Sequence, residues 1–229
     1  TVLLNDLLTP LTHEIMDQKG TIDKYMGDAI MAFWNAPVDV PNHPRIGCEA
    51  AIKMMIALEV LNRELIGSGR ISEPLKIGIG LNTGEVTVGN LGSEQRFDYS
   101  CLGDAINLGS RLEGLSKAYG VPIVIGESTY NVLDEPPSDA EVVLLDHVIV
   151  KGKSIPVAIC GIIPHENYNT DWCADHNTLM GLIEREVWDE VETVLGRLRD
   201  LDSYPAELLD QVIYRFENKV SAVREMTTK

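Results

Sequence analysis

Residues 21–34, TIDKYMGDAIMAFW, form the stretch that most restricts how this chain can fold. Two apolar, strand-prone runs flank the dipeptide Gly27–Asp28. Glycine accepts a positive φ at little cost, so the pair predicts a tight β-hairpin with Asp28 at its bend. Asp28 is open to two interpretations, a turn residue only or a carboxylate that binds a ligand. Lys24, four residues earlier, puts an amine on the same hairpin and favours a site for a metal-bound polyphosphate or a nucleotide base.

The composition and charge of the chain restrict its class and its partners. A length of 229 residues, 45% hydrophobic and 24% charged, fits one well-buried soluble core with an appendage. No uninterrupted apolar stretch approaches the roughly 18–20 residues of a membrane span, and the first residues lack a signal-peptide pattern. The formal charge of −16 argues against nucleic acid as a partner. Four cysteines without CxxC or zinc-type spacing predict reduced thiols in a cytoplasmic compartment.

The hydrophobic pattern alternates between helical and strand periods, which predicts an α+β sandwich rather than a doubly wound fold. Residues 2–18 and 45–66 have apolar residues at helical spacing on either side of the hairpin. Residues 75–81 predict a strand with one buried face, and Gly78 and Gly80 let a neighbour approach the other face. The remaining elements are expected as strands over 85–91, 96–102, 121–125, 142–150 and 157–163, and as helices over 105–119 and 127–133.

The end of the chain has a different pattern from the rest. Residues 164–176 are polar and irregular, which is typical of a linker after a domain formed by residues 1–163. Residues 177–229 carry apolar residues at three-four spacing on both sides of Pro205, which predicts a helical hairpin. Two interpretations stay open: the hairpin docks onto the preceding domain, or it dimerises as a coiled coil.

A second polar cluster lies in residues 99–111, YSCLGDAINLGSR. Asn107 and Arg111 are four positions apart on the predicted helix and therefore share a face. Asparagine is disfavoured inside a helix by roughly half a kcal/mol or more relative to alanine, and arginine offers a planar fork that suits phosphate oxygens. The pair fits a ligand site, or equally an Asn–Arg contact on a solvated face. Ser100, at the end of a strand, offers a hydroxyl.

Four segments within residues 1–163 follow one another in a recognisable order: TIDKYMGDAIMAF, LKIGIGLNTGEVTVGNLG, YSCLGDAINLGSRLEG and VKGKSIPV. Together they resemble the catalytic domain of class III nucleotidyl cyclases, of the bacterial-like Thr/Ser subclass. The resemblance implies a ferredoxin-like α+β domain that works as a head-to-tail homodimer with active sites between the chains. It also implies conversion of ATP to 3′,5′-cyclic AMP and pyrophosphate in signal transduction.

The resemblance implies that two of these residues contact the base and that a third binds a metal ion. Asp28 is similar to one of the two metal-binding aspartates of the family. Lys24 looks like the residue that reads the adenine ring, and Ser100 stands where the family places its second base-reading residue. Guanylate cyclases would be expected to carry Glu and Cys at the positions of Lys24 and Ser100. ATP is therefore the expected substrate.

The other residues that the resemblance assigns would act on the ribose and the phosphates. Asn107 resembles the residue that orients the ribose, and Arg111 the one that stabilises the pentavalent phosphorus. Lys151 looks like the lysine that binds the terminal phosphates, with Lys153 as a close rival. Two Mg²⁺ or Mn²⁺ ions about 3.5–4 Å apart would assist attack of the ribose 3′-hydroxyl on the α-phosphorus. The sequence shows no serine, histidine and acid arrangement that would supply a nucleophile.

One part of the family pattern has no counterpart in the sequence. The first metal-binding aspartate of the family lies on an opening strand before the first helix, in an FxDI-type segment, and residues 1–229 contain no such motif. We expect that strand upstream, in a larger protein in which a sensor or membrane-anchored region precedes this cytoplasmic part. We also expect residues 1–229 alone to show little cyclase activity.

Two other functions are weighed against adenylate cyclase. A catalytically inactive cyclase-like module that binds nucleotide or a partner would account for the missing aspartate. The otherwise complete set of residues opposes it: Lys24, Asp28, Asn107, Arg111 and Lys151. A diguanylate cyclase is disfavoured, because Met26–Gly27–Asp28 lacks the paired glycines and second acid of a GG[DE]EF-type hairpin.

Overall fold

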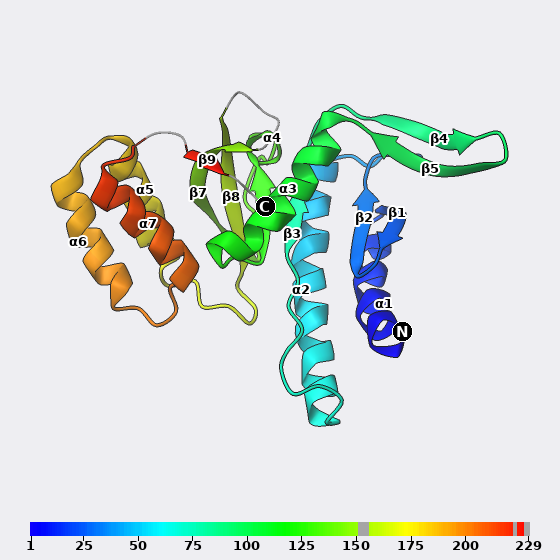
Figure 1. Cartoon of the computed structure of the whole chain (residues 1–229), viewed down its shortest axis with the longest axis horizontal. Helices are drawn as coiled ribbons and strands as arrows, with labels where there is room; N and C mark the ends of the chain where they lie inside the picture. Colours follow the sequence, from blue (N-terminus) through cyan, green and yellow to red (C-terminus); the bar gives the residue numbers. More distant parts are fainter. Residues whose placement is uncertain (151–155, 222–223, 227–229) are drawn as a thin grey trace. The chain divides into compact units, whose positions relative to one another are not determined.

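The structure is a computed structural model that describes residues 1–150, 156–221 and 224–226 (Figure 1). The chain divides into two units. The first unit comprises Thr1–Ile77 and Thr83–Asn107, and the second comprises Gly78–Asn82 and Leu108–Lys229. Helices and strands mix in both units, so the α+β class predicted from the sequence is confirmed.

The first unit contains the predicted hairpin. Its strands β1 (Thr21–Met26) and β2 (Ala29–Phe33) pair antiparallel, and Gly27 at the turn has a φ of 68°. This left-handed conformation explains the glycine, which adopts it without the steric cost of a Cβ. The helices α1 (Val2–Asp17) and α2 (His43–Gly67) pack against each other, and α1 also contacts both strands of the hairpin.

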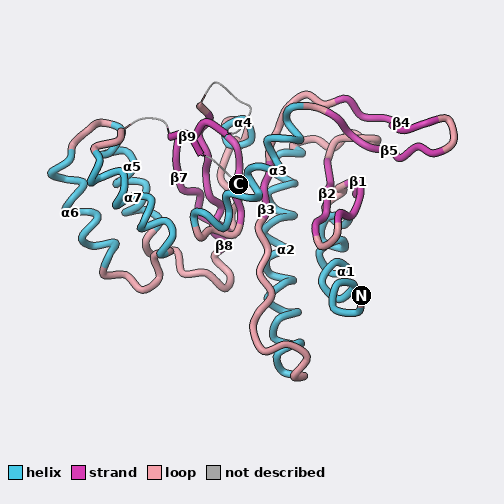
Figure 2. The backbone as a smooth tube through the Cα atoms, viewed as in Figure 1, coloured by secondary structure: helices cyan, strands magenta, loops and turns pink. Residues whose placement is uncertain are grey.

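A long antiparallel ribbon completes the first unit (Figure 2). Its strands are β4 (Thr87–Ser93) and β5 (Arg96–Leu102), and Gly89 lies opposite Ser100 in their register. Pairing begins two residues later than the strand predicted over 85–91. Because β5 also contacts β1, the ribbon brings Ser100 to the hairpin.

The second unit contains a mixed five-stranded sheet in the order β3-β6-β8-β7-β9. Pairing is parallel in β3–β6 and β7–β9 and antiparallel in β6–β8 and β7–β8. A one-turn helix α4 (Glu127–Tyr130) replaces the longer helix predicted over 127–133. The strands of this sheet are β3 (Ile79–Leu81), β6 (Ile123–Gly126), β7 (Ala140–Val150), β8 (Val157–Pro164) and β9 (Arg224–Met226).

The strand predicted over 75–81 is shorter in the structure, where β3 begins at Ile79. In the first unit, buried Asn62 takes both backbone hydrogen bonds of Leu75. Its Nδ2 donates to the Leu75 carbonyl at 2.9 Å, and its Oδ1 accepts from the Leu75 N–H at 2.7 Å. These backbone groups are then occupied and cannot join a strand ladder.

The helix α3 (Asp104–Tyr119) passes close to β3, as the glycine pattern predicted. A Cβ added at Gly80 would lie 2.2 Å from the Glu113 nitrogen and 2.3 Å from the Gly109 carbonyl oxygen. Any side chain at Gly80 would therefore push the helix away from the strand.

The C-terminal segment is helical, as predicted, with three helices where the spacing predicted two. The break falls at Glu186, whose φ of 60° lies in the left-handed region that ends helices. The first of these helices begins within the linker predicted over 164–176. The three are α5 (Cys173–Glu184), α6 (Trp188–Arg199) and α7 (Ala206–Asn218).

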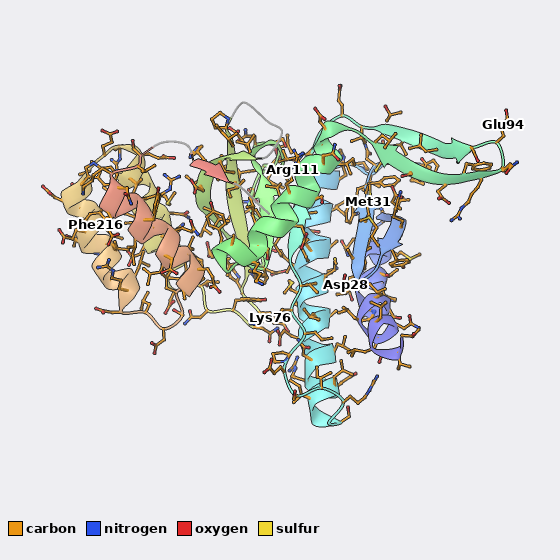
Figure 3. The ribbon with its side chains drawn as sticks, viewed as in Figure 1. Asp28, Met31, Lys76, Glu94, Arg111 and Phe216 are labelled. Carbon is orange, nitrogen blue, oxygen red and sulfur yellow. The ribbon has the colours of Figure 1, made fainter. Side chains whose placement is uncertain are left out.

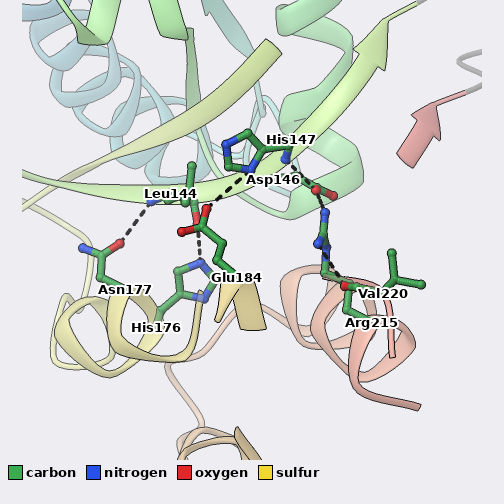
Figure 4. A network of polar contacts seen from close by, with 8 residues as sticks. All are labelled: Leu144, Asp146, His147, His176, Asn177, Glu184, Arg215 and Val220. Carbon is green, nitrogen blue, oxygen red and sulfur yellow. Dashed lines mark hydrogen bonds and ion pairs between the residues drawn. The ribbon is translucent and has the colours of Figure 1, made fainter. Parts of the chain in front are cut away.

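These helices dock onto the sheet of the second unit, so the structure supports the docking interpretation. Figure 4 shows polar contacts at this junction. The Nε2 of His176 donates to the Leu144 carbonyl at 2.8 Å, and Arg215 forms a buried ion pair with Asp146. One apolar core joins strands and helices, with members that include Val143, Leu145, Ile159, Leu179, Leu182, Val191, Leu198 and Leu208.

Two expectations from the composition can be compared with the described residues. The four cysteines are buried and unpaired, as expected for reduced thiols. Within the part of the chain that the structure describes, no helix has the length and apolar character needed to span a membrane.

Candidate active site

Lys24 and Asp28 both lie on the predicted hairpin. Lys24 is on β1, and its side chain is 47% exposed. Asp28 lies in the turn between β1 and β2 and is exposed (Figure 3). Both charged groups are therefore accessible to a ligand.

A β-bulge interrupts β1 between these residues and the start of the strand. Ile22 lies opposite Ala32 and Lys24 lies opposite Met31, so Asp23 is the extra residue without an opposite partner in the ladder. A bulge turns the affected side chain away from the regular alternation of the strand. It leaves Asp23 directed at the neighbouring strand β5.

The buried carboxylate of Asp23 connects Lys24 to Ser100. The Ser100 hydroxyl donates a hydrogen bond of 2.6 Å to Asp23 Oδ2, and the Cys101 backbone N–H donates to the same oxygen at 3.3 Å. The Lys24 ammonium lies 3.2 Å from Asp23 Oδ1, and the Asp23 side chain is 0% exposed. The two residues predicted to read the base are thus held by one acid that the sequence analysis did not single out.

The contacts of Asp23 keep it ionised. Burial acts to raise its pKa, but the hydrogen bond from Ser100, the contact with Lys24 and the Cys101 N–H together lower the pKa below its usual value. The neighbouring thiol behaves in the opposite way. Burial, followed by the charge of Asp23, raises the pKa of Cys101 to about 11. Cys101 therefore stays a protonated thiol and is no nucleophile at neutral pH.

Asn107 and Arg111 lie on α3, as predicted, and share a face by their spacing. Asn107 is exposed and Arg111 is half-buried, whereas Leu108 and Leu112 between and after them are buried. Figure 3 labels Arg111 on this helix. By the division of the chain, Asn107 belongs to the first unit and Arg111 to the second. The predicted Lys151 and its rival Lys153 lie outside the described residues.

Asp28 fits a metal ion as one ligand among several. In the ranges that the structure covers, no three His, Cys, Asp or Glu residues gather into a metal-binding group. Magnesium in nucleotide sites is often held by one or two carboxylates together with phosphate and water oxygens. The exposed carboxylate of Asp28 suits such a site, with the remaining ligands from the nucleotide and from a second carboxylate.

Comparison with known proteins identifies the family of the chain. Residues 1–163 match the family model of the adenylate and guanylate cyclase catalytic domain. An adenylate cyclase of Anabaena cylindrica is 40% identical over 159 residues, which are 68% of this chain and 30% of that protein. The chain spans no more than 30% of the length of the first curated relatives that it matches.

Solved structures give the same result for the fold. The adenylyl cyclase CyaB from P. aeruginosa has a TM-score of 0.65 at 31% identity, over 73% of this chain and 83% of that chain. The guanylyl cyclase Cya2 has a TM-score of 0.62 at 33% identity, over 72% of this chain and 81% of that chain. The resemblance expected from the sequence is confirmed, and the chain belongs to the adenylate and guanylate cyclase catalytic domain family.

Proposed function

We propose that this domain is an adenylate cyclase that converts ATP to 3′,5′-cyclic AMP and pyrophosphate. The observation that carries the proposal is the pairing of Lys24 with Ser100 through Asp23. This arrangement puts an ammonium and a hydroxyl at the two positions where the sequence resemblance places base-reading residues. The adenylate cyclase of Anabaena cylindrica and the adenylyl cyclase CyaB support the choice of ATP, while Cya2 shows that the same fold also occurs in a guanylyl cyclase.

The base contacts follow from the chemistry of the two side chains. A lysine ammonium only donates hydrogen bonds, so Lys24 suits the ring nitrogen N1 of adenine, which accepts. The Ser100 hydroxyl can accept from the exocyclic amino group of adenine. The Glu and Cys expected of a guanylate cyclase are absent from positions 24 and 100.

The reaction forms a bond between the ribose 3′-oxygen and the α-phosphorus and breaks the bond from that phosphorus to pyrophosphate. The 3′-hydroxyl proton leaves to a base or to solvent, and pyrophosphate takes up the bonding electrons. Asn107 would hold the ribose so that its 3′-oxygen faces the phosphorus. Arg111 would stabilise the charge that develops on the phosphoryl oxygens, and Lys151 would hold the terminal phosphates.

Asp28 would bind one of two Mg²⁺ or Mn²⁺ ions. When bound, the ions lower the proton affinity of the 3′-hydroxyl and neutralise charge on the phosphates. The complete site would form in a head-to-tail homodimer. One protomer would supply Asp28, and its partner would supply the base-reading, ribose and phosphate residues.

The proposal places the domain in the cytoplasm, as part of a longer signalling protein. The relatives from Anabaena and Dictyostelium are much longer than the part that matches this chain. The match covers 30% of the Anabaena protein and 7% of the Dictyostelium protein. A sensor or membrane-anchored region outside residues 1–229 would control the activity.

Turnover and nucleotide binding by the native full-length protein test the proposal. With Mg²⁺ or Mn²⁺, we expect cyclic AMP from ATP and a clear preference for ATP over GTP. Nucleotide binding without turnover would instead support the inactive module. Equal or better turnover of GTP would refute the assignment of the base.

A further inference from the structure

We propose that Asp23 sets the base specificity of the site by fixing the hydroxyl proton of Ser100 and the ammonium of Lys24. Asp23 touches no substrate in this proposal and acts as a positioning residue. The inference rests on the proposed function, because it assumes that Lys24 and Ser100 face the base.

The first step concerns the single proton of the Ser100 hydroxyl. An ionised carboxylate only accepts hydrogen bonds, so at 2.6 Å the proton of Ser100 must point at Asp23 Oδ2. Ser100 is 5% exposed and has little contact with water that could compete for this proton. Its oxygen therefore offers only lone pairs to any other group.

The second step concerns Lys24. Its side chain is 47% exposed and would sample many conformations on its own. The ion pair with Asp23 Oδ1 at 3.2 Å restrains the ammonium close to Ser100. The bulge at Asp23 makes this possible, since regular alternation would direct Asp23 and Lys24 to opposite faces of β1.

Together these restraints present the base with a hydrogen-bond donor, the Lys24 ammonium, and an acceptor, the Ser100 oxygen, at fixed positions. Adenine has an acceptor at N1 and a donor at its 6-amino group, which match Lys24 and Ser100. Guanine has a donor at N1 and an acceptor at O6. The Lys24 donor would then face the N1 donor, and the Ser100 acceptor would face the O6 acceptor. A hydroxyl that could rotate would lose this discrimination, because it could also donate to O6.

A purely structural role for Asp23 predicts a different result. If Asp23 only held β1 against β5, its removal would weaken binding of ATP and GTP equally. If Asp23 orients the base-reading pair, its removal changes the ratio between the two nucleotides. The ratio is therefore the decisive quantity.

The experiment compares Asp23→Ala and Asp23→Asn in the native full-length protein. Binding of ATP and GTP is measured by isothermal titration calorimetry, and kcat/KM is measured for each nucleotide. Asp23→Ala removes both restraints, and we expect the preference for ATP to fall by about tenfold or more. Asp23→Asn keeps the shape of the side chain. Its carbonyl oxygen can still accept from Ser100 or Lys24, but its NH2 group then faces the other residue, so only one of the two restraints is lost and the preference for ATP should fall by a smaller factor. In a Ser100→Ala background, Asp23→Ala should lower the preference less than it does in the wild type.

Asn62→Ala is the matched control. Asn62 is a buried polar residue of the same unit whose hydrogen bonds go to the backbone of Leu75, not to the base-reading pair. We expect it to lower the melting temperature while leaving the ratio of ATP to GTP unchanged.

The outcomes separate the inference from the function on which it rests. A wild-type protein without preference for ATP would refute the proposed function itself. A preference for ATP that Ser100→Ala lowers, but that both Asp23 variants keep, would refute the role of Asp23 alone. Loss of preference in both Asp23 variants, but not in Asn62→Ala, supports the inference. Asp23→Asn remains informative if Asp23→Ala fails to fold.

Discussion

At the scale of single residues, the candidate site depends on a few hydrogen bonds with defined direction. Lys24 and Ser100 lie on different strands, and the buried carboxylate of Asp23 contacts both of them. In the proposed function, the choice of base would therefore depend on three side chains rather than on one.

Exchange of the base-reading pair should change the nucleotide that is preferred. We expect Lys24→Glu together with Ser100→Cys to depress ATP turnover and favour GTP. An unpaired buried polar group costs about 1–3 kcal/mol and the exchange alters two such groups, so the ratio of the two kcat/KM values should shift by at least about tenfold. Initial rates of cyclic AMP and cyclic GMP formation by the full-length protein provide the measurement. An unchanged preference for ATP would show that these residues do not read the base.

The sequence predicted the elements that carry four of the candidate residues, but it did not single out Asp23. Lys24, Asp28, Asn107 and Arg111 lie on the elements expected for them. Asp23 escaped because strand alternation places it on the face opposite Lys24, and nothing in the local sequence announces a bulge. The bulge lies in the pairing of β1 with β2, and Ser100 and Cys101, the groups that contact Asp23, lie on β5, which is distant in the chain.

At the scale of the elements, close contacts of the backbone decide where helices lie. Gly80 is the clearest case, because the backbone of α3 occupies the space where a Cβ would stand. The glycines of the strand predicted this approach, whereas the early start predicted for the strand was wrong. The side chain of Asn62 bonds to the backbone N–H and carbonyl of Leu75 and so keeps Leu75 out of the strand. The local sequence pattern does not reveal this contact between residues 13 positions apart. The break at Glu186 was likewise missed, since the apolar spacing continues across it.

Substitution at Gly80 should therefore be much more damaging than substitution of a glycine on the helix itself. Gly80→Ala forces β3 and α3 apart, and we expect a loss of about 1–3 kcal/mol or more in the free energy of unfolding. Gly114→Ala on α3 is the matched control, because its added Cβ has no atom within 4 Å beyond its chain neighbours and the backbone of its own helix. Helix propensity predicts that this control gains up to about 1 kcal/mol. Urea unfolding of both variants measures the difference, and equal effects would contradict the close packing.

At the scale of the whole molecule, the C-terminal helices join the second unit, and the proposed function adds a second protomer. The C-terminal helices share one core with the sheet, and two buried polar residues of these helices, His176 and Arg215, bond to β7. His176 also accepts a hydrogen bond of 2.7 Å from the Tyr204 hydroxyl at its Nδ1.

Acid should weaken the attachment of these helices through His176. Burial lowers the pKa of His176 to about 4, with the Leu144 carbonyl acting in the opposite direction. In the unfolded chain the pKa of His176 has its usual value of 6.5, so the unfolded chain takes up the proton first as the pH falls. The stability that neutral His176 contributes is therefore complete above pH 6.5 and is lost as the pH decreases to 4. The loss over this window is on the order of 3 kcal/mol.

The variant His176→Gln should have a flatter dependence of unfolding free energy on pH between 4 and 6.5. Carboxylates titrate in both proteins, so the difference between the two curves reports His176. Denaturant unfolding at several pH values provides the curves. Parallel curves would show that the histidine does not titrate with folding.

The proposed dimer predicts complementation between two inactive variants. Asp28→Ala and Arg111→Ala homodimers of the full-length protein should each be nearly inactive, because both of their sites are damaged. In a mixed dimer one site carries both lesions and the other carries none, so activity should return to about half of the wild-type value per heterodimer. Absence of recovery despite demonstrated exchange of chains would mean that both residues serve the same site from one protomer.

The carboxylate of Asp146 is shared by two residues, one inside and one outside the part of the chain that matches the family. Asp146 of β7 accepts a hydrogen bond of 2.8 Å from Tyr119 at the end of α3 and pairs with Arg215 of α7. The family match ends at residue 163, before α7 begins. A chain cut at residue 163 would keep Asp146 and Tyr119 but lose the Arg215 guanidinium that pairs with Asp146, together with the helices that share the apolar core of the sheet. The boundary of the family match and the boundary of the apolar core therefore differ in this protein, because the core continues beyond residue 163 into α5, α6 and α7.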